Sequence, residues 1–153
     1  MITSIKGTGY EAIIVGMLAA MSAQLMKFIG HFLKTRKFDF RVLFTTGGMP
    51  SSHSAGVIGL STIVGFICGF DSIEFAIAFG YSSVVMYDAA GLRRAAGKMA
   101  KTINMMKEDF YQHKTPQMTG ERLKELLGHT PMEVAMGALW AVCFAYLIHY
   151  YVL

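Results

Sequence analysis

The chain has 153 residues, of which 54% are hydrophobic and 16% are charged, and its mean hydropathy is +0.44. A soluble domain carries about 25% charged residues, so this composition argues against a soluble protein and favours one integral-membrane domain over residues 1–153. The net charge of +4 is modest, and most Lys and Arg residues lie in two stretches between apolar segments. Nucleic acid is therefore not an expected partner.

Four apolar segments can cross a bilayer, at about residues 10–33, 54–70, 72–92 and 131–153. A spanning helix needs about 20 mostly apolar residues, and the first and fourth segments exceed that length. The second is shorter and the third contains two acidic residues, but both are rich in Gly, Ala and Ser, which let helices approach closely in lipid. We predict an all-α, polytopic membrane helix bundle with about four transmembrane spans. The alternative is a soluble all-helical core.

Two polar connections, at about 34–52 and 93–130, hold most of the basic residues. The stretch "AAGLRRAAGKMAKTINMMKEDF" predicts a helix that continues beyond the membrane, and "TGERLKELLG" predicts a second short amphipathic helix that ends at Gly128. The positive-inside rule places both connections in the cytoplasm of a bacterial-type cell and both termini outside. The protein is thus expected to be a multi-pass protein of the cell membrane.

Two further expectations concern single side chains. Asp88 lies near the end of the third segment, where pairing with Arg93 or Arg94 would offset the cost of a carboxylate close to lipid. Cys68 and Cys143 lie within apolar segments and are expected to be buried free thiols.

The stretch "GGMPSSHSAG" places a polar turn at the start of the second apolar segment. Its two glycines allow a tight turn, Pro50 fixes the entry to a helix, and Ser51 and Ser52 supply hydroxyl groups. The free N–H groups of the first helical turn form a ready site for an anion, and His53 lies within that turn. The alternative is that one serine only caps the helix and that His53 is a surface residue.

The stretch "ELLGHTPMEVAMGAL" contains the second polar cluster. The start of the fourth span fits a capping box formed by Thr130, Pro131 and Glu133. Glu133 can therefore have a purely structural role as a helix cap. Glu133 also follows His129 by four residues, close enough to fix the tautomer of the imidazole and leave its other nitrogen nucleophilic. His53 and His129 thus stand at helix starts on the same membrane side among basic residues, and this combination indicates a phosphate site.

These motifs resemble a known superfamily. "PSSH" resembles the central P-S-G-H motif of the PAP2 superfamily, which comprises lipid phosphate phosphatases and vanadium haloperoxidases. "GHTPMEVAMGAL" is similar to the last motif of that superfamily, in which an Asp follows the His by four residues. The wording "GGMPSSHSA", "MYDAAGLRRAAG" and "LKELLGHTP" resembles one branch, the divergent PAP2 family, and the resemblance extends from about Gln24 to Leu139.

The resemblance implies a role for each matching residue. His129 matches the nucleophile that forms a phosphohistidine, Glu133 matches the carboxylate that orients it, and His53 matches the general acid. Ser51, with the backbone N–H groups of Ser52 and His53, matches the phosphate cradle. In the superfamily, basic residues complete the phosphate site. Lys27 matches the lysine of the first motif, and the candidates for the arginines are Arg36, Arg41, Arg93, Arg94 and Arg122.

The sequence departs from the superfamily pattern in four places. The Arg-Pro that should follow Lys27 is absent, Ser52 replaces a glycine, Glu133 replaces an aspartate, and about four spans stand where the superfamily core has six helices. Three consequences are open: a site that is incomplete, one that is less active, or one completed by a partner subunit in a homo-oligomer.

The implied function is hydrolysis of a lipid phosphate or diphosphate, without metal or cofactor, by an enzyme whose partners are that substrate and membrane lipids. The alternatives are a haloperoxidase and a non-catalytic membrane protein that binds anionic lipid or phosphate. Fold resemblance alone does not decide between them.

Overall fold

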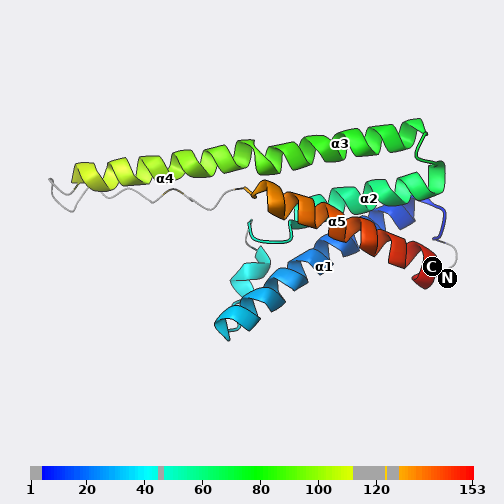
Figure 1. The fold of residues 1–153 in the computed structure, drawn as a ribbon, viewed down its shortest axis with the longest axis horizontal. Helices are drawn as coiled ribbons and strands as arrows, with labels where there is room; N and C mark the ends of the chain where they lie inside the picture. The colour runs from blue at the N-terminus through cyan, green and yellow to red at the C-terminus, as the bar shows by residue number, and fades with distance from the viewer. Residues whose placement is uncertain (1–4, 45–46, 112–122, 124–127) are drawn as a thin grey trace.

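The computed structural model describes residues 5–44, 47–111, 123 and 128–153, and all regular structure in these residues is helical. The helices are α1 (Gly9–Thr35), the 3₁₀ helix η2 (Phe40–Phe44), α2 (Ser52–Cys68), α3 (Ile73–Ala90), α4 (Leu92–Tyr111), α5 (Pro131–Leu147) and the π-helix η4 (Ile148–Val152). Both termini and the α2–α3 turn lie at one end of the bundle (Figure 1). The predicted all-α class is confirmed.

Among the residues that the structure describes, three helical stretches are long and apolar enough to cross a membrane: Gly9–Thr35, Ile73–Glu108 and Pro131–Val152. The apolar helix α2 is shorter, with 17 residues. These boundaries agree with the four predicted segments, and the predicted helix beyond the third segment is α4. The predicted amphipathic helix in "TGERLKELLG" lies outside the described residues, apart from Leu123 and Gly128.

Helix α2 packs against α1, α3 and α5, and small residues allow these helices to approach closely. A Cβ atom on Gly16 of α1 would lie only 2.9 Å from the carbonyl oxygen of Gly56 in α2. Three alanines from α1, α2 and α5 are fully buried at the centre of this packing: Ala19, Ala55 and Ala141. Close contact through small side chains is the usual basis of helix association in lipid.

A buried polar contact joins the two ends of the chain. Glu11 of α1 is fully buried, and its carboxylate accepts hydrogen bonds from the Gly7 N–H and from Nδ1 of His149 in η4. The His149 ring also packs against Phe66 of α2. This contact closes the bundle at the end where the termini lie.

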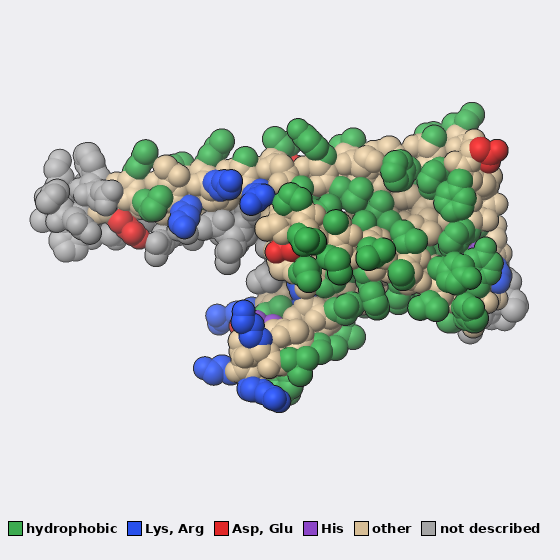
Figure 2. All heavy atoms as spheres, viewed as in Figure 1, with side chains coloured by type: hydrophobic (Ala, Val, Ile, Leu, Met, Phe, Trp, Pro, Cys, Tyr) green, Lys and Arg blue, Asp and Glu red, His purple; other side chains and the backbone are tan. Residues whose placement is uncertain are grey.

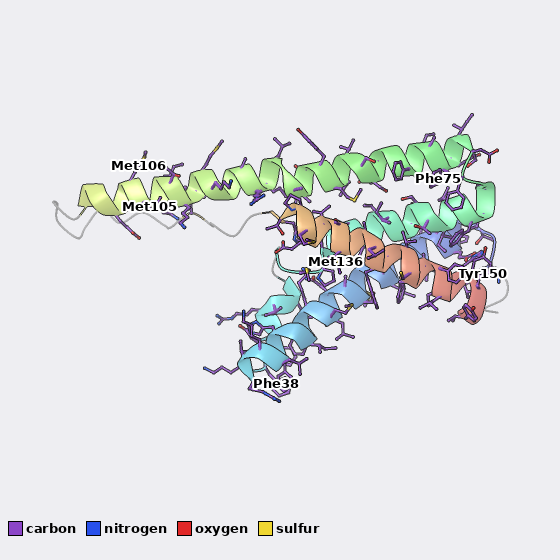
Figure 3. The ribbon with its side chains drawn as sticks, in the orientation of Figure 1. Phe38, Phe75, Met105, Met106, Met136 and Tyr150 are labelled. Atoms are coloured by element: carbon purple, nitrogen blue, oxygen red, sulfur yellow. The ribbon has the colours of Figure 1, made fainter. Side chains whose placement is uncertain are left out.

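Helix α4 continues from α3 and extends beyond the bundle (Figure 1), and Figure 3 places Met105 and Met106 on the extended part. Apolar side chains cover much of the bundle in Figure 2, whereas Lys and Arg gather on α4 and around the end of α1. Cys68 and Cys143 are free thiols, as expected, but both are exposed on the outer faces of α2 and α5, so the prediction that they are buried is wrong.

Candidate functional site

The start of α2, the α3–α4 junction and the segment before α5 meet at the end of the bundle opposite the termini (Figure 1). There, one small cavity is lined by side chains or backbone of His53, Asp88, Arg93, Gly128 and His129, together with Val85 and Ala89. The two histidine rings have centroids 6.1 Å apart. The two polar motifs of the sequence are therefore adjacent in the fold.

The turn before α2 is held in place by α5. Gly47 and Gly48 have φ angles of 127° and 82°, which only glycine adopts without strain, and the Met49–Pro50 bond is cis. The Ser51 N–H donates to the carbonyl of Glu133 at 3.0 Å. A Cβ atom on Gly137 would lie 3.0 Å from the Ser51 nitrogen, so α5 can approach this turn only because Gly137 has no side chain.

Ser51 is the N-cap of α2, which was one of the two predicted roles for the serines. Its Oγ accepts hydrogen bonds from the N–H of Ser54 at 3.3 Å and from the Ser54 hydroxyl at 3.0 Å. Ser51 is fully buried and is not among the residues that line the cavity, so its role as a phosphate ligand stays a prediction. The N–H groups of Ser52 and His53 belong to the first turn of α2, where a helix provides no backbone acceptor.

His129 is almost fully buried, with 3% of its surface exposed. Its backbone N–H donates to the carbonyl of Ala89 at 2.9 Å, which fixes the segment before α5 to the end of α3. Nδ1 of the ring lies 3.1 Å from Oε2 of Glu133. Because a carboxylate accepts a hydrogen bond, this contact selects the tautomer with the proton on Nδ1 and a lone pair on Nε2.

Glu133 forms the predicted capping box as well as the contact with His129. Its Oε2 accepts from the Thr130 N–H at 3.1 Å, and its own N–H donates to the Thr130 hydroxyl at 3.3 Å. One carboxylate therefore starts α5 and orients the imidazole, so the structural and functional interpretations hold together.

Burial lowers the pKa of His129 below its usual value of 6.5. The hydrogen bond from the ring to Glu133 acts in the opposite direction, and the positive charges of Lys27 and Arg93 lower the pKa further. The imidazole is consequently neutral at pH 7, which is the form that can act as a nucleophile or accept a proton.

Two cations approach the histidines from different helices. Arg93 of α4 lines the cavity, and its Nε donates to Oδ2 of Asp88 at 2.7 Å, which is one of the two predicted pairings. Lys27 of α1 is buried, and its Cδ would lie 3.4 Å from a Cβ on Gly48. Within the described residues, Nζ of Lys27 and Nε2 of His129 are buried without a hydrogen-bond partner. Lys27 is near enough for its charge to lower the pKa of His129, and because buried polar atoms are normally paired, these two unpaired atoms favour a ligand in this region.

The other predicted phosphate ligands that the structure describes are not among the residues that line this cavity. Ser52 lines two apolar grooves instead. Arg94 contacts Gly128 through its backbone, and its side chain does not line the cavity. Arg41 is exposed on η2. Arg122 lies outside the described residues, and no cluster of three or more His, Cys, Asp or Glu side chains suited to a metal occurs in the described part of the chain.

The family model described as the Divergent PAP2 family matches residues 9–144. The chain belongs to the Divergent PAP2 family. Both polar motifs and all four apolar segments fall largely within the matched residues, so membership in this family confirms the resemblance seen in the motifs.

The chain is also similar to the protein named "Uncharacterized membrane protein YuiD" from Bacillus subtilis (strain 168). The two are 38% identical over 144 residues, which cover 88% of this chain and 91% of the relative. That relative's name describes a membrane protein, in agreement with the candidate membrane spans of this chain. No solved structure matches the chain.

Sequence reasoning missed the residues that hold the site together. Gly137 allows the two motifs to meet, and the carbonyl of Ala89 fixes the second motif to α3, yet neither group is chemically reactive. The sequence offered one signal for this contact: Gly137 is a small residue in the helix that begins beside the site, and small residues permit close helix packing.

Proposed function

We propose that this Divergent PAP2 protein is a membrane-embedded, metal-independent phosphatase that hydrolyses a lipid phosphate or diphosphate through a phosphohistidine intermediate. One observation carries the proposal: Nδ1 of His129 contacts Glu133, while its buried Nε2 has no partner among the described residues. A neutral imidazole held in this way keeps an unshared lone pair on Nε2, as a nucleophile requires.

The reaction has two steps. In the first, Nε2 of His129 attacks phosphorus, and the bond from phosphorus to the bridging oxygen breaks. Protonated His53 gives its proton to the departing oxygen, so that an alcohol, or phosphate in the case of a diphosphate, leaves. In the second, water attacks the phosphohistidine and gives a proton to His53, which releases phosphate and restores His129.

Positive groups around the histidines supply the electrostatic part of catalysis. Asp88 binds Nε of Arg93 and thereby orients the guanidinium, whose terminal nitrogens suit phosphate oxygens. Lys27 adds a buried charge from α1, and the first N–H groups of α2 add the positive end of a helix dipole. Such donors stabilise the negative charge that develops on the equatorial oxygens.

The same cations would serve a protein that binds anionic lipid or phosphate and does not turn it over. Turnover is what separates this alternative from the phosphatase. The test is phosphate release from a panel of lipid phosphates and diphosphates by the detergent-purified protein.

We expect His129→Ala to lower the rate of release at least about 10³-fold, since it removes the nucleophile. The matched control is His31→Ala, because His31 lies on α1 outside the cavity. Rapid quenching of the wild-type reaction with a labelled substrate should trap a phosphohistidine that is stable to alkali and labile to acid. Release by His129→Ala at a rate close to wild type would contradict the assignment. Binding of the panel without any release by the wild type would favour the non-catalytic alternative.

A further inference from the structure

An apolar groove with a volume of about 730 Å³ lies beside the candidate site. Residues of α1, η2 and α5 form its walls, among them Leu18, Met21, Leu25, Leu43 and Phe144. The volume falls within the usual range for pockets that bind small molecules. Met21 is 64% exposed and Leu25 is 54% exposed, and α1 is a candidate span, so the groove opens on a surface that faces lipid.

His53 connects this groove to the cavity that contains His129. The residue lines the groove, and it also lines the small cavity with Arg93 and His129. A molecule with a phosphate in the cavity and a hydrocarbon chain in the groove would therefore place its bridging oxygen beside His53. That is the atom to which a general acid must give a proton.

Gln24 supplies a polar atom within the groove. Its Nε2 donates to the carbonyl of Leu43 at 2.7 Å, and this contact fixes the orientation of the amide. Oε1 is then a buried acceptor that has no partner in the described part of the chain. An acceptor of this kind is costly to leave unpaired, and a donor on a bound molecule would remove that cost.

The position of Gln24 relative to Lys27 indicates where that donor lies. The two residues are three positions apart on α1 and therefore share a face of the helix. Gln24 lies about 4.5 Å farther from the site end of α1 than Lys27, at 1.5 Å per residue. A donor that reaches Oε1 is thus a few atoms from a phosphate that reaches Nζ of Lys27.

We propose that the groove binds the hydrocarbon chain of the lipid phosphate, and that Gln24 selects substrates carrying a hydroxyl or amide N–H a few atoms from the phosphate. This inference rests on the proposed function for the identity of the site. A smaller apolar groove of about 390 Å³ also begins at Ser52 and His53, but Gln24 does not line it. The selection therefore belongs to the larger groove.

The first test compares two single-chain substrates that differ in one group, 2-hydroxyhexadecyl phosphate and hexadecyl phosphate. We expect the wild type to prefer the hydroxylated substrate by about tenfold or more in kcat/KM, because only that substrate pairs the buried acceptor. Gln24→Met retains the shape of the side chain and should bring the ratio close to one. The ratio is measured within each variant, so the folded fraction does not affect it. A wild-type ratio near one, or a ratio unchanged in Gln24→Met, would overturn the role of Gln24.

The second test measures binding without turnover. Trp140 is the single tryptophan of the chain; its Nε1 donates to the Ser22 hydroxyl, and its ring packs against Phe144, both of which line the groove. A phosphate with a brominated chain, at low mole fraction in detergent, should quench Trp140 fluorescence in His129→Ala. The brominated alcohol with the same chain should quench less at the same concentration.

Groove filling provides the matched comparison. Met21→Phe should weaken the quenching by the brominated phosphate about tenfold in concentration, while Met26→Phe should not, since Met26 is exposed on α1 but does not line the groove. Quenching without any phosphate release by the wild type would retain the groove and reject the phosphatase. Release without quenching, and without preference for the hydroxyl, would retain the phosphatase and reject the groove. Equal effects of the two Phe variants would also reject the groove.

Discussion

His129 is held by contacts that act in opposite directions on its charge. Burial and two nearby cations favour the neutral ring, whereas the hydrogen bond to Glu133 favours the protonated ring. The balance lies below the usual pKa of 6.5, so the nucleophile is available at neutral pH. Glu133 therefore orients the ring, but its hydrogen bond also raises the pKa of His129 and so opposes the effect of burial.

This balance predicts a pH profile. Activity requires neutral His129, so kcat/KM should fall as the pH decreases through the lowered pKa, and the acid limb should lie below pH 6.5. Glu133→Gln removes a contact that raises this pKa, so the acid limb should move to lower pH while kcat decreases. The measurement is kcat/KM against pH for the two proteins on one soluble aryl phosphate. An acid limb that moves upward in Glu133→Gln would contradict the assigned tautomer.

The contact between α5 and the turn before α2 is a feature of whole elements. Gly137 lies against the backbone of Ser51, and the Ser51 N–H donates to α5, so the position of α5 determines the position of the turn. Since His129 and Glu133 immediately precede or begin α5, both motifs depend on the same helix.

Gly137→Ala should therefore destabilise the protein by about 1–3 kcal/mol, because the added methyl group overlaps the Ser51 backbone. It should also lower kcat, although Gly137 carries no reactive group. Gly80→Ala is the matched control, since Gly80 is also within a helix and a Cβ there meets nothing within 4 Å. Unfolding in detergent and phosphate release measure the two effects. A Gly137→Ala protein as stable and active as Gly80→Ala would exclude this contact.

At the opposite end, Glu11 and His149 couple α1 to η4. His149→Leu should destabilise the bundle by about 3–5 kcal/mol, because it leaves a fully buried carboxylate without its principal partner. The double variant Glu11→Leu with His149→Leu should recover most of that loss. Unfolding in detergent tests both, and a double variant less stable than His149→Leu would show that the pair is not the source of the effect.

For the molecule as a whole, the site lies at the end opposite the termini, where the basic residues of α4 and the end of α1 also gather (Figure 2). Positive residues near span ends set orientation, so we expect this end to face the cytoplasm. Single cysteines at Asp71, in the α2–α3 turn, and at Lys98, on α4, report the two sides in a Cys68→Ala, Cys143→Ala background. An impermeant thiol reagent on intact cells should label position 71 and spare position 98. The reverse pattern would place the site outside.

The parts of this fold that depend on neighbours in the sequence could be predicted. The capping box of Thr130 and Glu133, the Ser51 cap and the Asp88–Arg93 pair all join residues at most five positions apart. The apolar segments could be located because a spanning helix requires length and hydropathy alone.

Contacts between distant segments could not be predicted in this way. The motifs named Lys27 as a ligand but not its burial beside Gly48, and they gave no signal for the groove or for the Gln24 amide, whose partner is 19 residues away. The apolar surroundings of Cys68 and Cys143 in the sequence also did not indicate burial, since both residues lie on exposed helix surfaces that face lipid. In a membrane the outer face of a helix is as apolar as its core, so hydrophobicity does not indicate which side is buried.

The pair formed by Glu11 and His149 also has a consequence for the order in which the chain is synthesised and assembled. Glu11 is synthesised with the first helix, and His149 follows 138 residues later. Throughout that interval the carboxylate must remain in an unfinished assembly, where a polar group among lipid chains is costly. Insertion of the first helix therefore stays provisional until the last helix leaves the ribosome. We therefore expect a chain truncated before His149 to be less stable, because Glu11 then lacks its principal partner.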